Sequence, residues 1–173
     1  MPAYADAAPQ GATEAAKAAN PFFTESPLPL HYPQFDKIKD SHFAPAFDAG
    51  MAEQLKEIEA IANNADAPTF ENTIIPMEKS GQVLDRATTV FFALVGADTN
   101  KDREKLQGEY STKFAAHSDA ISLNGKLFAR IKALYDSRDT LGLDAQSVRL
   151  IERYHTSFVR SGANLSDADK ATL

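Results

Sequence analysis

Hydrophobic positions along most of the chain recur at alternating spacings of three and four residues, the period of one face of an α-helix. This pattern predicts five helices, at about 42–63, 70–97, 100–121, 125–138 and 145–161. No stretch alternates apolar and polar residues between hairpin turns, as strands would, and the connections between helices are short. The sequence therefore predicts an all-α protein, an antiparallel helical bundle.

The helix at 70–97 has the clearest pattern. Its stripe alternates spacings of four and three, as in the seam of an antiparallel bundle, and consists of Phe70, Ile74, Met77, Gly81, Leu84, Thr88, Phe91 and Val95. Thr69 is the predicted N-cap. Pro76 should kink or restart the helix, because its ring removes the hydrogen bond to residue 72. We expect Leu84 and Phe91 to be buried.

The other helices carry similar stripes. The stripe of the first helix consists of Phe43, Phe47, Met51, Leu55, Ile58 and Ile61, and that of the third consists of Leu106, Tyr110, Phe114, His117 and Ile121. The stripe of the fourth helix consists of Leu127, Phe128, Ile131, Leu134 and Tyr135. The stripe of the fifth helix consists of Val148, Ile151, Tyr154 or His155, and Phe158. Asp144 is the predicted N-cap of the fifth helix. A further helix should begin at Ser166, three residues before Asp169, although few residues follow it.

Composition divides the chain into three zones. Residues 1–19 are rich in alanine, have almost no large apolar groups and predict a mobile tail. Residues 20–40, with four prolines, predict an extended Pro-rich arm whose apolar side chains must lie against something. Residues 41–173 form the predicted bundle. The tail has no apolar core segment, so it is not an intact signal peptide, although it could be a spacer left after one was removed.

Charge and cysteine content narrow the function classes. The net charge of −6 comes from interspersed acidic and basic residues, which argues against nucleic acid or an anionic membrane as a partner. The longest apolar run, "VFFALVGA", is too short to cross a bilayer. There is no cysteine, so disulfides and thiolate metal sites are excluded.

The four histidines are the residues most capable of chemistry, and they are His31, His42, His117 and His155. None has a second histidine three or four residues away, so no single helix offers two imidazoles to a metal. His117 and His155 could meet across the bundle with a carboxylate, but a core histidine that donates to a backbone carbonyl or a carboxylate is the more ordinary interpretation. In "HSDA", Ser118 and Asp119 point away from His117, which excludes a catalytic triad.

Acidic residues on the first predicted helix give no clear site either. Glu53, Glu57 and Glu59 surround Lys56 and predict a solvated helix face rather than a binding cluster. The glycines never form a phosphate-binding loop after a strand. The sequence thus predicts no catalytic, cofactor-binding or metal-binding residue within this chain.

Several stretches found together in order carry a resemblance to a known family. They are "NPFF", "PQFDKIKDSHFAPAFDAGM", "PTFENTIIPMEKSGQVLDRATTVFFAL", "AISLNGKLFARI" and "LGLDAQSVRLIERYHTSFVRSGANL". Over about residues 20–173 the chain resembles the N-terminal part of bacterial peptidyl-dipeptidases (dipeptidyl carboxypeptidases), in the thimet-oligopeptidase family of zinc metallopeptidases.

The resemblance implies a function for a longer parent enzyme. That parent would use zinc to release C-terminal dipeptides from short peptides, and this helical part would form one wall of the substrate channel. The family's HExxH zinc motif is absent here, so we expect the chain to be a domain truncated near Leu173. Alone, the chain should bind no zinc and should be inactive. Its expected partner is the catalytic domain of the same polypeptide. Truncation should also leave the chain able to associate with itself.

Two alternatives remain open at this point. A related oligopeptidase that cuts internal bonds would have a similar bundle, and a free-standing helical module could bind a protein partner over the arm. The bacterial cytoplasm and the periplasm are both compatible with the sequence.

Overall fold

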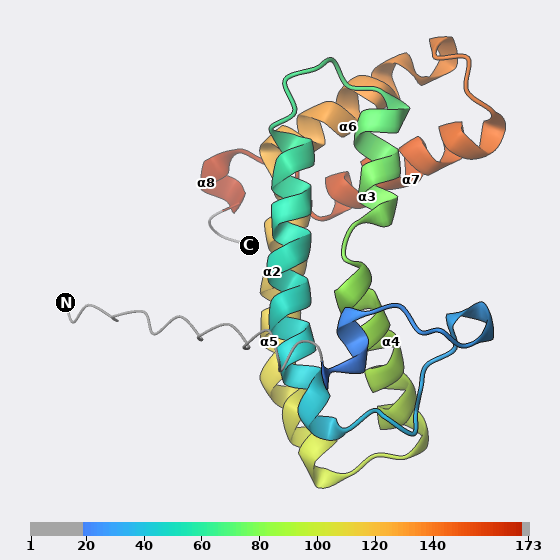
Figure 1. Cartoon of the computed structure of the whole chain (residues 1–173). Coiled ribbons are helices and arrows are strands. Elements are labelled where there is room, and N and C mark those ends of the chain that lie inside the picture. Colours follow the sequence, from blue (N-terminus) through green and yellow to red (C-terminus); the bar gives the residue numbers. More distant parts are fainter. Residues whose placement is uncertain (1–18, 171–173) are drawn as a thin grey trace.

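The computed structural model describes residues 19–170, in which every regular element is helical (Figure 1). The short turns are η1 (Pro21–Phe23), η2 (Pro29–His31), η3 (Asp40–His42), the π-helical η4 (Phe70–Ile74) and η5 (Arg138–Thr140). The helices are α2 (Phe43–Ala62), α3 (Ile75–Lys79), α4 (Gln82–Ala97), α5 (Lys101–Ser122), α6 (Gly125–Ser137), α7 (Ala145–Arg160) and α8 (Asp167–Lys170). The predicted all-α fold class is confirmed. Residues 1–18, which hold nearly all of the predicted tail, lie outside the described residues.

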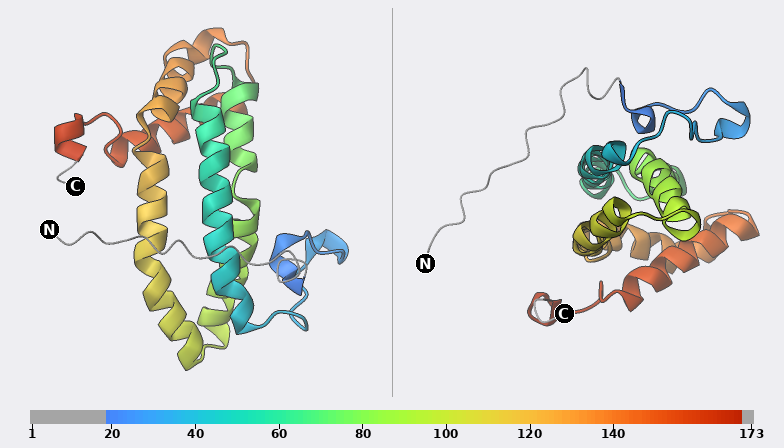
Figure 2. Two further views of the ribbon diagram at one scale, coloured as in Figure 1. Left: turned by 60° about the vertical axis from the view of Figure 1, so that its left-hand side comes forward. Right: turned by 90° about the horizontal axis from the view of Figure 1, so that it is seen from below.

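Three neighbouring helical columns, each antiparallel to the next one along the chain, form the body of the molecule. α2 runs in one direction, α3 and α4 return beside it, and α5 runs parallel to α2 (Figures 1 and 2). α6 continues beyond α5, and α7 packs against α6 at the same end. None of the described helices is both long enough and apolar enough to span a bilayer.

Apolar side chains gather at the two ends of these columns. At the end near the arm, aromatic rings dominate, and the fully buried members include Phe43, Phe47 and Phe91. The Phe43 and Phe47 rings lie 5.0 and 5.3 Å from the Phe91 ring, both edge-on, which is a favoured aromatic geometry. At the other end, aliphatic residues of α2, α3 and α6 pack with Phe158 of α7, and a small third cluster joins η4 to α6 and α7.

The predicted helix at 70–97 is divided at two places. The restart at Pro76 is confirmed, because a π-helical turn ends at Ile74 and α3 begins with Pro76 in its first turn, where a missing N–H costs nothing. A second break after Lys79 was not predicted. There Ser80 is extended and donates its hydroxyl to the Met77 carbonyl at 2.8 Å, while Gly81 adopts a φ of 73° that glycine tolerates.

This second break changes which face of α4 is buried. The buried residues of α4 are Val83, Ala87, Val90 and Phe91, so Phe91 is buried as predicted. Leu84, also predicted to be buried, is only half-buried, because the turn at Gly81 shifts the helical phase. Close contact with α2 depends on Gly50, where an added Cβ would lie 2.7 Å from the Leu84 backbone nitrogen.

Most remaining stripe and cap predictions are confirmed. Thr69 accepts a hydrogen bond from the Asn72 amide at 3.1 Å, and Asp144 accepts from Gln146 and Ser147. The Ser166 hydroxyl accepts from the Asp169 amide, so the short helix α8 does begin there. On α2, Leu55 is 37% exposed, and its predicted burial is wrong.

The arm lies along α4, but only part of it is covered. Phe22 is 3% exposed and its ring is 5.1 Å from the Phe43 ring. Leu30, in contrast, is 98% exposed, and Leu28, Tyr32 and Phe35 are also exposed. The prediction that the arm packs against the bundle holds for its beginning, whereas its outer loop presents apolar side chains to solvent.

Candidate interaction surface

The structure separates the two histidines that the sequence placed on apolar faces. His117 of α5 bonds Gln54 of α2 through its Nε2 atom at 2.7 Å. The His155 ring of α7 stacks on the Tyr135 ring, with centroids 3.8 Å apart. Because the two rings have different neighbours, the alternative in which His117 and His155 meet across the bundle is wrong.

Metal-binding geometry is missing from the part of the chain that the structure describes. Within residues 19–170, no three side chains of histidine, aspartate or glutamate come together as a metal-binding group. A catalytic zinc needs about three protein ligands and an open position. The described residues therefore do not fit the zinc that the resemblance implies for a parent enzyme. The expected absence of catalytic and cofactor-binding residues stays a prediction.

An open trough with a partly apolar lining lies between α4 and α5. α4 and α5 both pack on α2, and the three helices form a triangle when viewed along their axes (Figure 2). The Phe92 ring of α4 and the Phe114 ring of α5 approach each other across the trough, with centroids 6.4 Å apart. The trough has a volume of about 750 Å³. Leu84 and Phe92 line it from α4, Phe114 and His117 line it from α5, and Gln54 of α2 lies at its floor.

A series of hydrogen bonds in this trough indicates which ring nitrogen of His117 donates to Gln54. Ser80 donates its hydroxyl proton to the Met77 carbonyl, so its oxygen accepts from Gln54 Nε2 at 3.4 Å. Gln54 Oε1 therefore faces His117 and accepts from its Nε2–H. The Nδ1 atom is buried without a partner, and burial lowers the pKa of His117. His117 is thus a buried core histidine, but its partner is the side-chain amide of Gln54 and not the backbone carbonyl or carboxylate that the ordinary interpretation expects.

Arg130 is a buried cation that the sequence did not reveal. Its side chain lies under the loop between α2 and η4, and the residue is 7% exposed. The guanidinium donates to the carbonyls of Asn64 and Asp66 at 2.8 and 3.0 Å, and to the side chains of Asn72 and Thr73. Since all these acceptors are neutral, Arg130 orders the loop rather than forming an ion pair.

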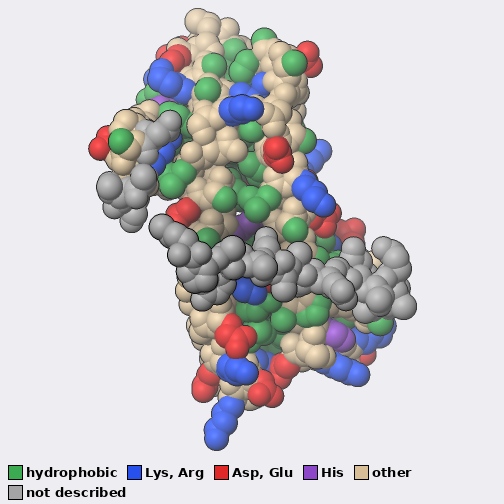
Figure 3. All heavy atoms as spheres, turned by 90° about the vertical axis from the view of Figure 1, so that its left-hand side faces the viewer, with side chains coloured by type: hydrophobic (Ala, Val, Ile, Leu, Met, Phe, Trp, Pro, Cys, Tyr) green, Lys and Arg blue, Asp and Glu red, His purple; other side chains and the backbone are tan. Residues whose placement is uncertain are grey.

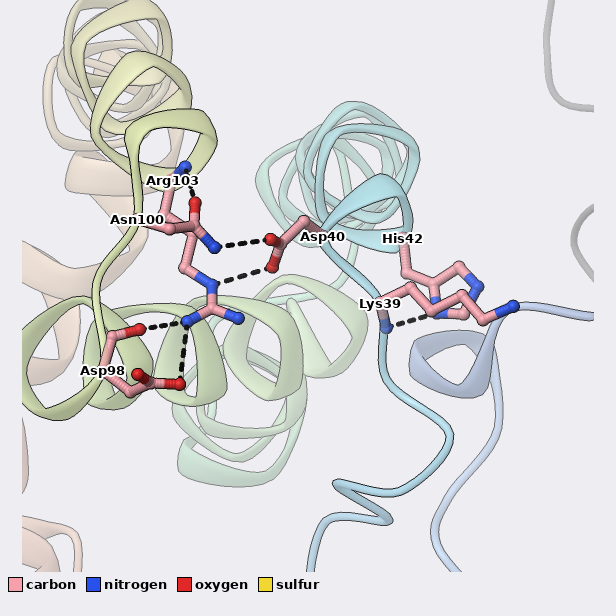
Figure 4. Close-up of polar contacts among 6 residues, drawn as sticks. All are labelled: Lys39, Asp40, His42, Asp98, Asn100 and Arg103. Atoms are coloured by element: carbon pink, nitrogen blue, oxygen red, sulfur yellow. Dashed lines mark hydrogen bonds and ion pairs between the residues drawn. The ribbon is translucent and has the colours of Figure 1, made fainter.

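A second arginine joins the arm to the start of α5 (Figure 4). Arg103 donates through Nε to Asp40 at 2.7 Å and also bonds the Asp98 carbonyl, while Asn100 donates to Asp40 at 2.8 Å. Burial would raise the pKa of Asp40, but the bonds from Asn100 and Arg103 and the Arg103 charge outweigh it and hold this pKa below its usual value. The contact fixes the point where the arm enters α2.

The remaining polar candidates are structural or solvated. Glu57 is half-buried and accepts the Gly81 amide at 2.8 Å, so its assignment to a solvated face is wrong. Glu53, Glu59 and Lys56 are exposed, as predicted. Figure 3 shows charged side chains of both signs interspersed with hydrophobic ones on the face that it views. No single-sign patch dominates that face.

Comparisons with known proteins identify proteins of similar sequence. No protein-family model matches it. It is 47% identical over 154 residues to the dipeptidyl carboxypeptidase of Escherichia coli, and 46% identical over 156 residues to that of Salmonella typhimurium. These matches cover 89% and 90% of this chain but only 23% of each relative. The resemblance expected from the sequence is confirmed: over most of its length the chain is similar to bacterial dipeptidyl carboxypeptidases, of which it spans less than a quarter.

Proposed function

We propose that this chain is the helical wall domain of a zinc-dependent dipeptidyl carboxypeptidase. The observation that carries the proposal is the 47% identity over 154 residues, which extends through the arm and bundle but covers 23% of the relative. The rest of such a polypeptide would supply the zinc, the catalytic residues and the other walls of the peptide channel. The substrates would be short peptides with a free C-terminus.

The exposed apolar surface supports a role as part of a larger assembly. Phe92 is 47% exposed beside the trough, and the outer loop of the arm exposes Leu30 completely. Leu28, Tyr32 and Phe35 are exposed on the same loop as Leu30, and apolar groups gathered in this way mark contact surfaces in soluble proteins. In the proposed enzyme, the missing part of the polypeptide covers them.

A chimera tests this role. The matched 154-residue segment of the E. coli dipeptidyl carboxypeptidase is replaced by this chain, and dipeptide release is measured from a short peptide with a free C-terminus. We expect activity that a chelator abolishes, and no activity from the 173-residue chain alone.

Two controls make the result decisive. A C-terminally amidated peptide should be cleaved poorly, whereas equal cleavage would favour an oligopeptidase that cuts internal bonds. The variant Phe92→Asp should weaken the chimera, because it places a charge in the trough. A folded chimera without any activity would refute the proposal.

A further inference from the structure

A second hollow lies between the arm and α4, and it shares Asp85 and Thr89 of α4 with the trough. The arm folds against the outer side of α4 (Figures 1 and 2), and the two elements border an open-sided cavity of about 250 Å³. Pockets for drug-sized ligands typically measure about 300–1,000 Å³. This cavity therefore has room for a molecule of about one amino acid.

One part of the cavity wall is apolar and firmly packed, and polar residues of the arm and α4 form the rest. Phe22 and Val90, which are 3% and 4% exposed, line it together with Ile38 and two prolines of the arm. Both Phe22 and Val90 belong to the aromatic core cluster, and Ile38 packs against that cluster. An apolar side chain entering the cavity would contact surfaces that are already fixed.

One charged group in the cavity lacks a counter-ion. Arg86 is half-buried, and its Nε and Nη2 atoms both donate to the Phe22 carbonyl, at 3.2 and 3.1 Å. Among residues 19–170 no carboxylate pairs with it, although a guanidinium has five N–H donors. The Nη1 group is left for a ligand, and a carboxylate matches the planar geometry of arginine.

A carboxylate of the protein also lines the cavity. Asp85 precedes Arg86 on α4; it is exposed, it lines both this cavity and the trough, and among the described residues it forms no ion pair with Arg86. Asp85 would repel a plain anion but would attract an ammonium group. A zwitterion with an apolar side chain satisfies both charges.

The outer loop of the arm is held in a strained shape next to this cavity. Leu30 and His31 have φ values of 55° and 56°, in the left-handed region that is unfavourable for residues other than glycine. Ser26 ties the loop by donating to the Tyr32 carbonyl at 2.6 Å, and His31 contacts the Ser26 carbonyl through Nδ1. Ser26 and His31 both line the cavity, so the strained turn shapes one of its walls.

We propose that the cavity between the arm and α4 binds a free apolar α-amino acid. Arg86 takes the carboxylate, Asp85 takes the ammonium group, and the apolar walls take the side chain. The site is independent of the proposed peptidase function, since all its parts lie in this chain.

The test is a calorimetric titration of the 173-residue chain with L-leucine. Leucinamide, which lacks the carboxylate, is the matched probe, and we expect it to bind about 10- to 100-fold more weakly, the range for hydrogen bonds to a charged group. N-acetylleucine, which lacks the ammonium group, should also bind more weakly than leucine, because Asp85 then repels it. Glycine should bind least, since it has no side chain for the apolar walls.

Variants separate binding from the stability of the arm. Arg86→Gln should lower leucine affinity at least tenfold, but it could also release the arm from α4. Thr89→Phe therefore serves as a second variant, because Thr89 is exposed and lines the cavity, while the bonds from α4 to the Phe22 carbonyl of the arm come from Arg86. It should abolish leucine binding by filling the space. Arg149→Gln, on exposed α7, is the control and should bind leucine normally.

Three results would overturn the proposal. Equal affinity for leucine and leucinamide would remove the role of Arg86. Displacement of leucine by phosphate at similar concentrations would show general anion binding. Unchanged leucine affinity in Thr89→Phe would place the bound molecule elsewhere.

Discussion

Truncating Phe91 to alanine should remove a large share of the stability of the bundle. Phe91 has no exposed surface, and its ring meets those of Phe43, Phe47 and Phe92 at 5.0 to 5.4 Å. Burying such a side chain contributes about 1.5–3 kcal/mol. The cavity left among these rings raises the cost of Phe91→Ala to about 3–5 kcal/mol.

The assay is urea unfolding followed by circular dichroism, with thermal melting as a second measure. A domain's total stability is about 5–15 kcal/mol, so the urea midpoint should fall markedly. For a chain of this size the melting temperature should drop by about 6–20 °C. Phe92→Ala is the matched control, because Phe92 is the next residue and is 47% exposed. We expect it to cost roughly 1 kcal/mol, as for a partly exposed side chain.

The reasoning would be refuted if Phe91→Ala melted within a degree or two of the parent chain. It would also fail if the Phe91 and Phe92 variants were equally destabilised. Either result would mean that the aromatic cluster does not hold α2 and α4 together.

Other predictions address the polar network, titration, association and metal binding. Arg130→Met should lower the free energy of unfolding by about 3 kcal/mol, because it leaves the Asn64 and Asp66 carbonyls without donors. Amide exchange should then become faster in residues 63–69, and an unchanged exchange pattern would contradict this prediction. Burial lowers the pKa values of His42, His117 and His155 in the folded chain. As the pH falls, these histidines therefore bind protons in the unfolded chain before they do so in the folded chain, and the free energy of unfolding should decrease between about pH 7 and 5. A smaller fall is expected in His117→Phe, and equal urea midpoints at both pH values would exclude the effect. Sedimentation should detect concentration-dependent association that Phe92→Asp reduces; a strictly monomeric chain would argue against an uncovered contact surface. After dialysis against zinc, the chain should retain less than one tightly bound ion, and stoichiometric zinc would refute the absence of a metal site.

The sequence was most informative where local patterns alone decide the structure. Helical periodicity located the main helices, and single side chains at Thr69, Asp144 and Ser166 identified their starts. The break at Gly81 was missed because glycine also occurs inside helices, and only the packing of Gln54 and Glu57 against that turn makes it necessary. Burial of Leu84 failed for the same reason, since the break changed the phase of its helix.

The surface and its polar groups were harder to predict. Arg130 lies one residue from the apolar Ile131 and looks like an exposed helical arginine, yet its partners are about 60 residues away in sequence. The trough and the arm cavity each combine residues from separate elements. Such sites depend on tertiary packing, which one sequence does not display.

The break between α3 and α4 also bears on how the molecule unfolds. Because one column is interrupted at Ser80 and Gly81, the aromatic and aliphatic ends are joined mainly through the continuous helices α2 and α5. Each end can therefore act as its own cooperative unit, with α2 as the element common to both. The slowest-exchanging amides should lie in the middle of α2. When one end of the bundle opens first, the other end should stay folded around its part of α2.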